Sequence, residues 1–148
     1  MKGIDFLSKL ALRMKNYEFG WIGSGHEIEG VKKICEFRQL DPSFMLDVSK
    51  DYDFFISPSR ADPNPTTILE CMAWGFPIIC TPQSGYYETS YLFNIHSDDM
   101  GRSLDTLNQL QHMPEDNLIS ISKKAREVVK SEYTWDKFTS TIINQLPK

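Results

Sequence analysis

Residues 53–81 read DFFISPSRADPNPTTILECMAWGFPIICT, and this stretch decides the fold. Its two apolar runs, 53–57 and 77–81, lack the alternation of polar and apolar residues that marks a strand with one wet face. Between them, residues 66–74 have the composition of a helix and are followed by Gly75, a common residue just beyond a helix end. We therefore predict a strand, a helix and a second, parallel strand, all buried in one domain.

The rest of the chain repeats this alternation. Cap residues mark several helix starts, namely Ser24 with Glu27, then Asp41, and then Ser97. The further strands expected are 17–23, 35–40 and 91–95, and the further helices are 4–15, 26–34, 42–50, 98–111, 114–132 and 134–146. Because alternating helices and apolar strands form a helix-covered parallel sheet, we predict an α/β, Rossmann-like domain with about five strands and helices on both faces.

The composition is that of one globular domain, and we assign all of 1–148 to it. A net charge of −4 provides no overall basic surface, so we expect no nucleic-acid partner. No apolar run approaches the ~18 residues of a membrane span. We expect no transmembrane segment and a cytoplasmic location, and we leave peripheral membrane contact open. Cys35, Cys71 and Cys80 lie in apolar surroundings and are expected to be buried thiols of a reducing compartment.

Ligands of parallel sheets bind beyond the carboxyl ends of the strands, so the loops there hold the candidate residues. Lys2 and Gly3 lie at the start of a helix, where free N–H groups and a partial positive charge attract anions. A solvated lysine near a chain end is the alternative. Gly23 and Ser24 lie in a strand-end turn, which fits either the approach of a ligand or a simple tight turn. The sequence contains neither the dinucleotide-binding glycine fingerprint nor a P-loop.

The strongest candidates lie in the polar loop 59–65 and the helix that follows it. Asp62 is in the loop, Glu70 is one turn into the helix, and the N–H groups of Thr66 and Thr67 lie between them. Hydrogen-bond acceptors on two sides of an anion-binding helix end suit a diphosphate flanked by hydroxyl-rich groups, as in a nucleotide sugar. The alternative, that Asp62 is a loop acid and Glu70 a solvated helix residue, stays open.

This stretch resembles the C-terminal half of glycosyltransferases with the GT-B fold, in particular the large retaining family four. That family has two acids separated by seven residues, then Ala/Cys-Met-Ala-x-Gly-x-Pro and a strand. Here Asp62 and Glu70 have that spacing, and Cys71-Met72-Ala73-Trp74-Gly75-Phe76-Pro77 follows. Three other family-like segments occur in the right order, namely Lys2-Gly3, Ser84-Gly85-Tyr86-Tyr87-Glu88 and Tyr133-Thr134-Trp135.

The resemblance implies transfer of a hexose-type sugar from a nucleotide donor to a hydroxyl acceptor with retention, as in polysaccharide biosynthesis. It implies three candidate catalytic residues. Glu70 would accept hydrogen bonds from the ribose, Asp62 would contact the transferred sugar, and Lys2 would stabilise the departing diphosphate. Gly23 and Ser24 would lie near the phosphates or ribose, and Gln39 and Leu40, at the end of the second strand, would offer backbone groups to the base. The donor-binding candidates are Lys2, Gly3, Gly23, Ser24, Gln39, Leu40, Asp62, Asn64, Pro65, Thr66, Thr67 and Glu70. No metal or cofactor is expected.

The chain departs from the family in three places. Asp62 stands where glutamate is usual and reaches one methylene less, and Pro63-Asn64-Pro65 replaces a stretch that often contains glycine. The family's arginine lies before its lysine, at a place ahead of the first residue here. We expect the N-terminal acceptor domain, which would bind a glycan or lipid, to be absent from this chain, and the isolated chain to transfer little or no sugar.

Two other functions were weighed. A binding module that kept the fold and lost the chemistry stays an alternative. A hydrolase that uses Asp62 and Glu70 as an acid–base pair is disfavoured, because a helix-end position suits anion binding better than acid–base catalysis.

Overall fold

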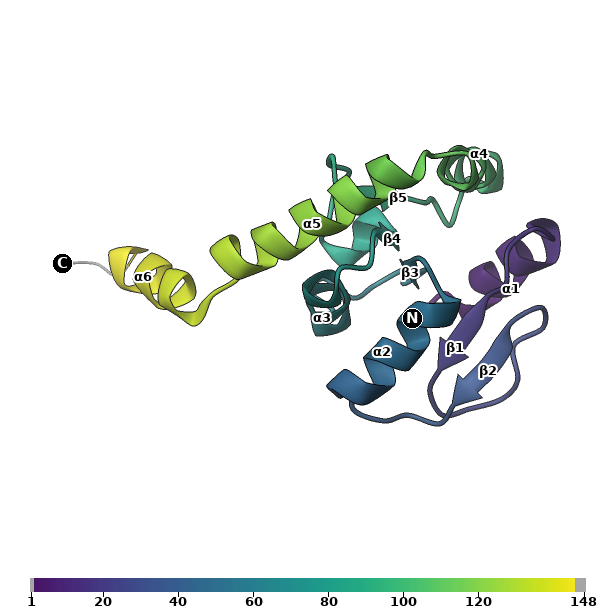
Figure 1. Ribbon diagram of the computed structural model, residues 1–148, viewed down its shortest axis with the longest axis horizontal. Helices are drawn as coiled ribbons and strands as arrows, with labels where there is room; N and C mark the ends of the chain where they lie inside the picture. Colours follow the sequence, from purple (N-terminus) through teal and green to yellow (C-terminus); the bar gives the residue numbers. More distant parts are fainter. Residues whose placement is uncertain (1, 146–148) are drawn as a thin grey trace.

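The computed structural model describes residues 2–145, and over them helices and strands follow the predicted order, except that the helix expected between the first two strands is absent (Figure 1). The elements are α1 (Ile4–Arg13), β1 (Gly20–Ile22), β2 (Lys32–Cys35), α2 (Pro42–Asp51), β3 (Phe55–Ser57), α3 (Thr66–Trp74), β4 (Ile78–Cys80), a 3-10 turn η1 (Pro82–Ser84), β5 (Leu92–Asn94), α4 (Met100–Gln111), α5 (Glu115–Glu132) and α6 (Trp135–Gln145). The predicted α/β class is confirmed.

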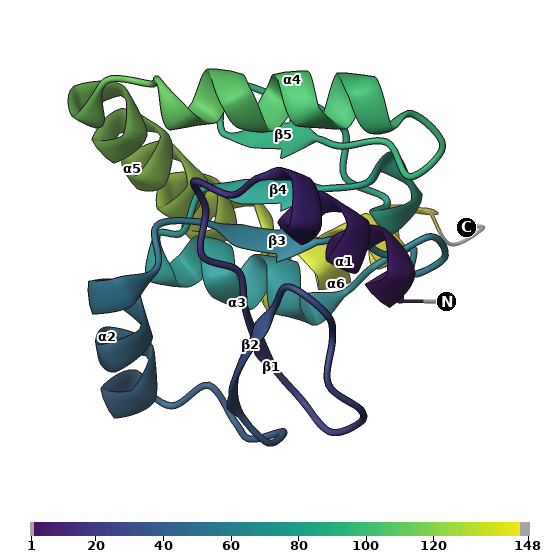
Figure 2. The same ribbon diagram turned by 90° about the vertical axis from the view of Figure 1, so that its right-hand side faces the viewer.

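The strands are all parallel, but within the described residues they form two sheets instead of one. β3, β4 and β5 lie side by side in chain order, with Ile79 of β4 opposite Ile56 and Phe93. β1 pairs with β2 alone, and its register shifts between Trp21 and Ile22. Figure 2 shows the smaller pair below the three-stranded sheet. The expected sheet of about five strands is therefore present as a group of three and a group of two.

Helices cover both faces of the three-stranded sheet. Successive residues of a strand point to opposite faces, and β4 is buried along its whole length. Ile79 packs in a core with residues of α1 and α4, whereas Ile78 and Cys80 pack in a second core with residues of α2, α3 and α5. The two cores lie on opposite sides of β4, which confirms the predicted arrangement of helices on both faces.

The region between β1 and α2 differs from the prediction. No helix forms over 26–34, because Gly30 adopts a left-handed conformation with φ of +79° and the Val31 N–H turns back to the Ile28 carbonyl. β2 covers Lys32–Cys35 and not 35–40, so Gln39 and Leu40 lie beyond the strand and not at its end.

The predicted cap residues have mixed outcomes. Asp41 caps α2 as predicted, since its carboxylate accepts the Phe44 N–H at 3.1 Å. The predicted cap of α4 was wrong, because Asp99 and not Ser97 accepts the hydrogen bond there, from the N–H of Arg102. Asp99 lies three residues before Arg102, which is the usual spacing between a capping side chain and the N–H group that it binds.

α6 lies at the far end of α5, away from the sheets (Figure 1). None of its described residues is buried, and Trp135, Phe138 and Ile143 are exposed. Across residues 2–145, each helix is too short or too polar to cross a lipid bilayer.

Candidate functional site

The loop after β3 leads directly into α3, at the carboxyl edge of the sheet where parallel-sheet ligands bind. α3 begins after Pro65, and no side chain caps this end. Thr66 and Thr67 are exposed residues, and their N–H groups, at the positive end of the helix dipole, donate no hydrogen bond within the described residues. α2 and α4 differ from it, because aspartate side chains close their N-termini.

The start of α1 lies against this loop and is also uncapped. Gly3 takes the left-handed conformation, with φ of +69°, and offers no side-chain cap. Lys2 reaches across to the loop, with its Nζ 2.6 Å from Oδ2 of Asp62. The Lys2 side chain is 74% exposed and that of Asp62 is 25% exposed. The structure therefore brings together two predicted site residues that are 60 positions apart in the chain.

Two further contacts fasten α1 to the same loop. Nη2 of Arg60 lies 2.8 Å from Oδ2 of Asp5, and this hydrogen bond holds the pKa of Asp5 below its usual range. The backbone of Gly3 lies so close to Pro58 that an added Cβ would be 1.8 Å from the Pro58 carbonyl oxygen. Only glycine, which has no Cβ, fits at position 3 so close to Pro58. This packing is a second reason for a glycine here, beside the anion contact expected from the sequence.

The loop after β3, residues 58–65, is called the site loop. The loop between β4 and β5 contacts its other side. The Thr81 hydroxyl donates to the Ser59 carbonyl, and the Asp62 N–H donates to the Gln83 carbonyl at 3.4 Å. Because its neighbours and its own amide are bonded in this way, the backbone of Asp62 has little freedom to move.

Asn64 is oriented by a buried tyrosine. The Tyr86 hydroxyl donates to Oδ1 of Asn64 at 3.0 Å, while Asn94 donates to the Tyr86 carbonyl at 3.1 Å. Burial raises the pKa of Tyr86 to about 12, so its hydroxyl keeps its proton and remains a donor at physiological pH.

Glu70 is exposed on α3, four residues after Thr66. Residues four apart lie on the same face of a helix, so the Glu70 carboxylate stands one turn behind the uncapped end. It forms no hydrogen bond or ion pair with any other residue in 2–145, and it is therefore available to a ligand.

Two pairs of predicted residues are less closely joined to this cluster. Gly23 and Ser24 were expected near the phosphates or ribose, and Gln39 and Leu40 near the base. Gly23 is buried and its N–H donates to the Cys35 carbonyl at 3.1 Å. Ser24 and Gln39 are exposed, and Leu40 packs against the core under α2 and α3. Within the described residues, no hydrogen bond or ion pair connects these four to the 58–70 loop and helix.

Sequence reasoning gave no role to Asp5, Arg60 or the Tyr86 hydroxyl. Asp5 and Arg60 carry opposite charges and lie in the two segments that were predicted to form the site. This charge pattern could have predicted the ion pair between them. The Tyr86–Asn64 bond depends on how two loops pack and leaves no comparable sign in the sequence.

Two open hollows lie elsewhere, with volumes of about 460 and 570 Å³. Residues 15–19 with Gly30 and Lys32 line the first, and residues 27–31 with Lys33 line the second. The first hollow lies at the amino end of β1. The second lies just before and at the start of β2, and its lining includes the exposed acidic residues Glu27 and Glu29. Neither position matches the carboxyl edge at which parallel sheets bind anionic ligands.

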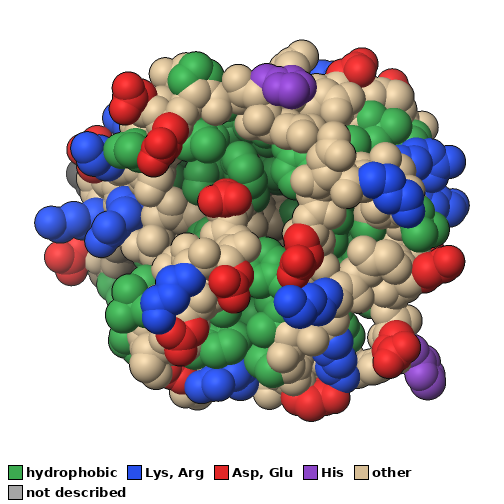
Figure 3. All heavy atoms as spheres, turned by 45° about the vertical axis from the view of Figure 1, so that its right-hand side comes forward, with side chains coloured by type: hydrophobic (Ala, Val, Ile, Leu, Met, Phe, Trp, Pro, Cys, Tyr) green, Lys and Arg blue, Asp and Glu red, His purple; other side chains and the backbone are tan. Residues whose placement is uncertain are grey.

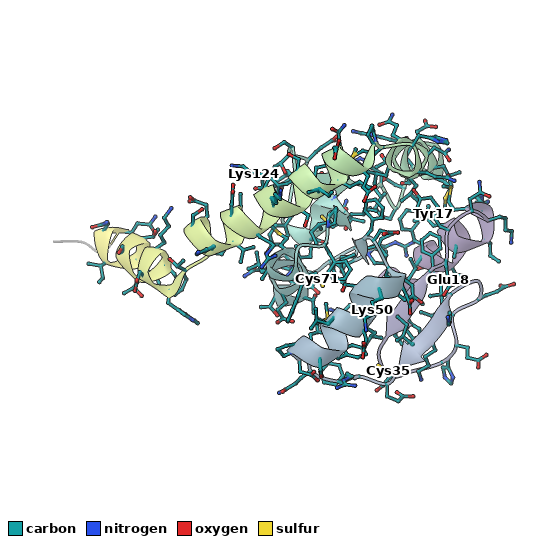
Figure 4. All side chains as sticks on the ribbon, viewed as in Figure 1. Tyr17, Glu18, Cys35, Lys50, Cys71 and Lys124 are labelled. Atoms are coloured by element: carbon teal, nitrogen blue, oxygen red, sulfur yellow. The ribbon has the colours of Figure 1, made fainter. Side chains whose placement is uncertain are left out.

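Metal-binding clusters and disulfides are not found among residues 2–145. No group of three or more His, Cys, Asp or Glu side chains there could hold a metal ion. Cys71 and Cys80 are buried, whereas Cys35 is only half-buried in β2, and Figure 4 shows Cys35 well away from Cys71. The expected free thiols are present, and burial is complete for two of the three.

The surface carries charges of both signs. On the face in Figure 3, acidic and basic side chains are interspersed around apolar ones, with no continuous basic patch. This face therefore presents no broad positive surface.

Comparison with known proteins gives one informative relative. No protein-family model matches the chain. An "Uncharacterized glycosyltransferase" of Haemophilus influenzae is 30% identical over 96 residues, a match that covers 55% of this chain and 27% of that protein. The chain is related to a glycosyltransferase. The match spans about a quarter of the relative's length.

Proposed function

We propose that this chain is the donor-binding domain of a nucleotide-sugar-dependent glycosyltransferase, the C-terminal half of a GT-B fold resembling retaining family four. One observation carries the proposal. Lys2, at the uncapped start of α1, contacts Asp62, beside the uncapped start of α3, at the carboxyl edge of a parallel sheet. The relationship to a glycosyltransferase supports the same reading independently of this geometry.

The diphosphate of the donor would bind between the two helix ends. The N–H groups of Thr66 and Thr67 lie at the uncapped start of α3, and the Lys2 ammonium, largely exposed, contacts Asp62 in the loop that leads to it. In the transfer, the bond between the sugar C1 and the β-phosphate oxygen breaks, and the diphosphate leaves with the electron pair. The acceptor oxygen bonds to C1 and gives its proton to the departing diphosphate oxygen. Lys2 and the α3 end would stabilise the charge that develops on the leaving group.

The hydroxyl groups of the donor would be held by acceptors on either side. Glu70 is exposed and unpaired within the described residues, which suits hydrogen bonds from the ribose. Asp62 would accept from the transferred sugar, a hexose, and the Tyr86-oriented Asn64 lies two residues further along the loop. Gly3 and Pro65 would shape the approach to the two helix ends. Gly23 and Ser24 would lie near the phosphates or the ribose, and Gln39 and Leu40 would offer backbone groups to the base.

The remaining features are part of the same proposal. Positive charge comes from Lys2 and the helix ends, so we propose catalysis without a metal or cofactor. The acceptor, a glycan or lipid, would bind through another domain, and this chain alone would transfer little sugar. Its place would be polysaccharide biosynthesis in the cytoplasm, with a nucleotide sugar and not a nucleic acid as its ligand.

Calorimetry tests the proposal with UDP, GDP and ADP and with UDP-glucose, GDP-mannose and ADP-glucose. We expect at least one nucleotide series to bind, and Glu70→Ala to weaken that binding by about tenfold or more through loss of charged hydrogen bonds. Glu127→Ala is the matched control, because Glu127 is an exposed carboxylate on α5. Absence of binding to every nucleotide at millimolar concentration would contradict the proposal. Donor binding by the full-length protein without transfer would favour the non-catalytic module.

A further inference from the structure

The two side chains proposed for different parts of the donor are bound to each other in the structure. Lys2 would contact the diphosphate and Asp62 the sugar, yet their Nζ and Oδ2 atoms are 2.6 Å apart. The site therefore holds its own cation and anion in an ion pair. Binding of a donor has to exchange that pair for two new contacts.

From this pair we infer that Asp62 lets the site distinguish the intact nucleotide sugar from the nucleoside diphosphate that remains after transfer. The inference rests on the proposed function. A nucleotide sugar offers phosphate oxygens to Lys2 and sugar hydroxyls to Asp62, so both charged groups regain partners. The nucleoside diphosphate offers only phosphate oxygens, and it leaves the Asp62 carboxylate beside an anion.

The two partners differ in mobility, and this decides which of them moves. Lys2 is a long side chain and is largely exposed, so its ammonium can turn from the carboxylate to a phosphate. Asp62 is three-quarters buried, and its N–H is bonded to the Gln83 carbonyl. Two residues before it, Arg60 is tied to Asp5. The carboxylate therefore stays in place when Lys2 leaves it.

The energetics of the exchange favour the sugar donor. An ion pair with an exposed lysine contributes little stability, so separating Lys2 from Asp62 costs little. A carboxylate left without its cation next to a diphosphate is repelled by it, and the repulsion grows as the distance shortens. Hydrogen bonds from sugar hydroxyls to the carboxylate offset this repulsion. Once the sugar has been transferred, that compensation is lost and the product binds more weakly.

The test compares two ligands in one variant. In Asp62→Asn, the nucleoside diphosphate should bind about threefold more tightly, because a negative charge near it is removed. The matching nucleotide sugar should bind about tenfold more weakly, because hydrogen bonds to a charged acceptor are lost. Calorimetry with UDP and UDP-glucose, or with whichever pair wild type binds best, measures both. Asp62→Ala should shift the diphosphate in the same direction.

Asp5→Asn is the matched control. It removes the other ion pair between α1 and the loop, but Asp5 has no proposed contact with the donor. The ratio of the two affinities should stay at its wild-type value. A melting temperature for each variant shows that the folded chain is being compared.

Two outcomes separate this inference from the proposed function. If both ligands shift in the same direction in Asp62→Asn, while Lys2→Ala weakens the binding of both, the nucleotide site stands and this inference is overturned. If wild type binds neither ligand, the proposed function fails and the inference fails with it. Opposite shifts in Asp62→Asn, with an unchanged ratio in Asp5→Asn, support the discrimination.

Discussion

The three-stranded and two-stranded sheets differ in how firmly the rest of the chain holds them. β4 is buried at every position and has a packed core on each face. β1 and β2 contain no buried residue, and their register is interrupted between Trp21 and Ile22. The loop after the smaller sheet's first strand contains Gly23, Gly25 and Gly30 in place of a helix.

This difference divides the candidate site into a part on the larger sheet and a part on the smaller sheet. The residues proposed to contact the diphosphate, the transferred sugar and the ribose, namely Lys2, Asp62 and Glu70, lie on or beside elements packed on the larger sheet. The proposed base contacts, Gln39 and Leu40, follow the smaller sheet, and so do Gly23 and Ser24, which are expected near the phosphates or ribose. We therefore expect the anion site to be rigid and the base site beside it to be more flexible. The predictions below compare the stability of the two sheets that carry them.

The largest effect is expected in the core of β4. Ile79→Ala should lower the free energy of unfolding by about 3–4 kcal/mol, because it leaves a cavity between packed helices and sheet. Ile22→Ala, at a half-buried position of β1, should lower it by only about 1–2 kcal/mol. Urea denaturation followed by circular dichroism measures both. Equal losses would show that the two sheets are held equally well.

A smaller loss is expected where the site loop meets the β4–β5 loop. Gly85 has φ of +78°, and a Cβ there would be 2.3 Å from the Pro63 carbonyl oxygen. Gly85→Ala should cost about 2–3 kcal/mol, since a side chain strains the backbone and displaces the loop that carries Asp62.

Gly101→Ala is its control, because the nearest atom to its Cβ would be 3.5 Å away, an ordinary contact. This variant should be neutral or slightly stabilising in the same urea experiment. A neutral Gly85→Ala would mean that the loop is not fixed by this contact.

Hydrogen exchange should separate the two sheets in the wild-type chain. The Ile95 N–H donates to the Cys80 carbonyl at 3.0 Å, and the Gly23 N–H donates to the Cys35 carbonyl at 3.1 Å. The bonds are similar in length, but we expect the Ile95 amide to exchange at least about tenfold more slowly, because the larger sheet opens less often. Amide exchange followed by NMR measures this, and faster exchange at Ile95 would reverse the contrast.

The smallest effect concerns the cap of α2, which follows the smaller sheet. Hydrogen bonds from Ser43, the Phe44 N–H and Arg38 lower the pKa of Asp41 to about 2. Because this pKa lies below the unfolded value, the ionised cap stabilises the fold above about pH 4, and that stability is lost as pH falls toward 2.

Asp41→Asn keeps a capping side chain but does not titrate. Thermal melts between pH 5 and pH 2 should therefore fall less steeply for this variant than for wild type. Parallel curves for the two proteins would show that Asp41 does not contribute to the acid sensitivity.

The sequence predicted the larger sheet better than the smaller one, and the reason is physical. Around β3, α3 and β4, apolar runs, Pro65 and Gly75 all favour the same structure, so α3 was predicted at its observed bounds. Between Gly23 and Leu40, the Ser24 and Glu27 pattern favoured a helix that Gly30 prevents. The Ser24 hydroxyl instead lies beside Glu36, whose pKa Lys33 and Ser24 both lower.

The site shows the same limit of local reasoning. Lys2 and Asp62 were both named from local signals, but their mutual contact joins segments far apart in the chain. Only the packing of α1 against the loop after β3 creates it, through the close approach of Gly3 to Pro58. The roles of Lys2, Asp62, Glu70 and the other site residues toward a ligand all stay predictions.

The burial of two of the three thiols has a practical consequence. Burial raises the pKa of both Cys71 and Cys80 to about 12, so neither forms the reactive thiolate in the folded chain. An alkylating reagent should modify Cys35 alone in the native protein and all three after unfolding. Intact-mass spectrometry of alkylated samples would therefore report global opening without any substitution, and a fluorophore on Cys35 would sit in the strand nearest the proposed base contacts.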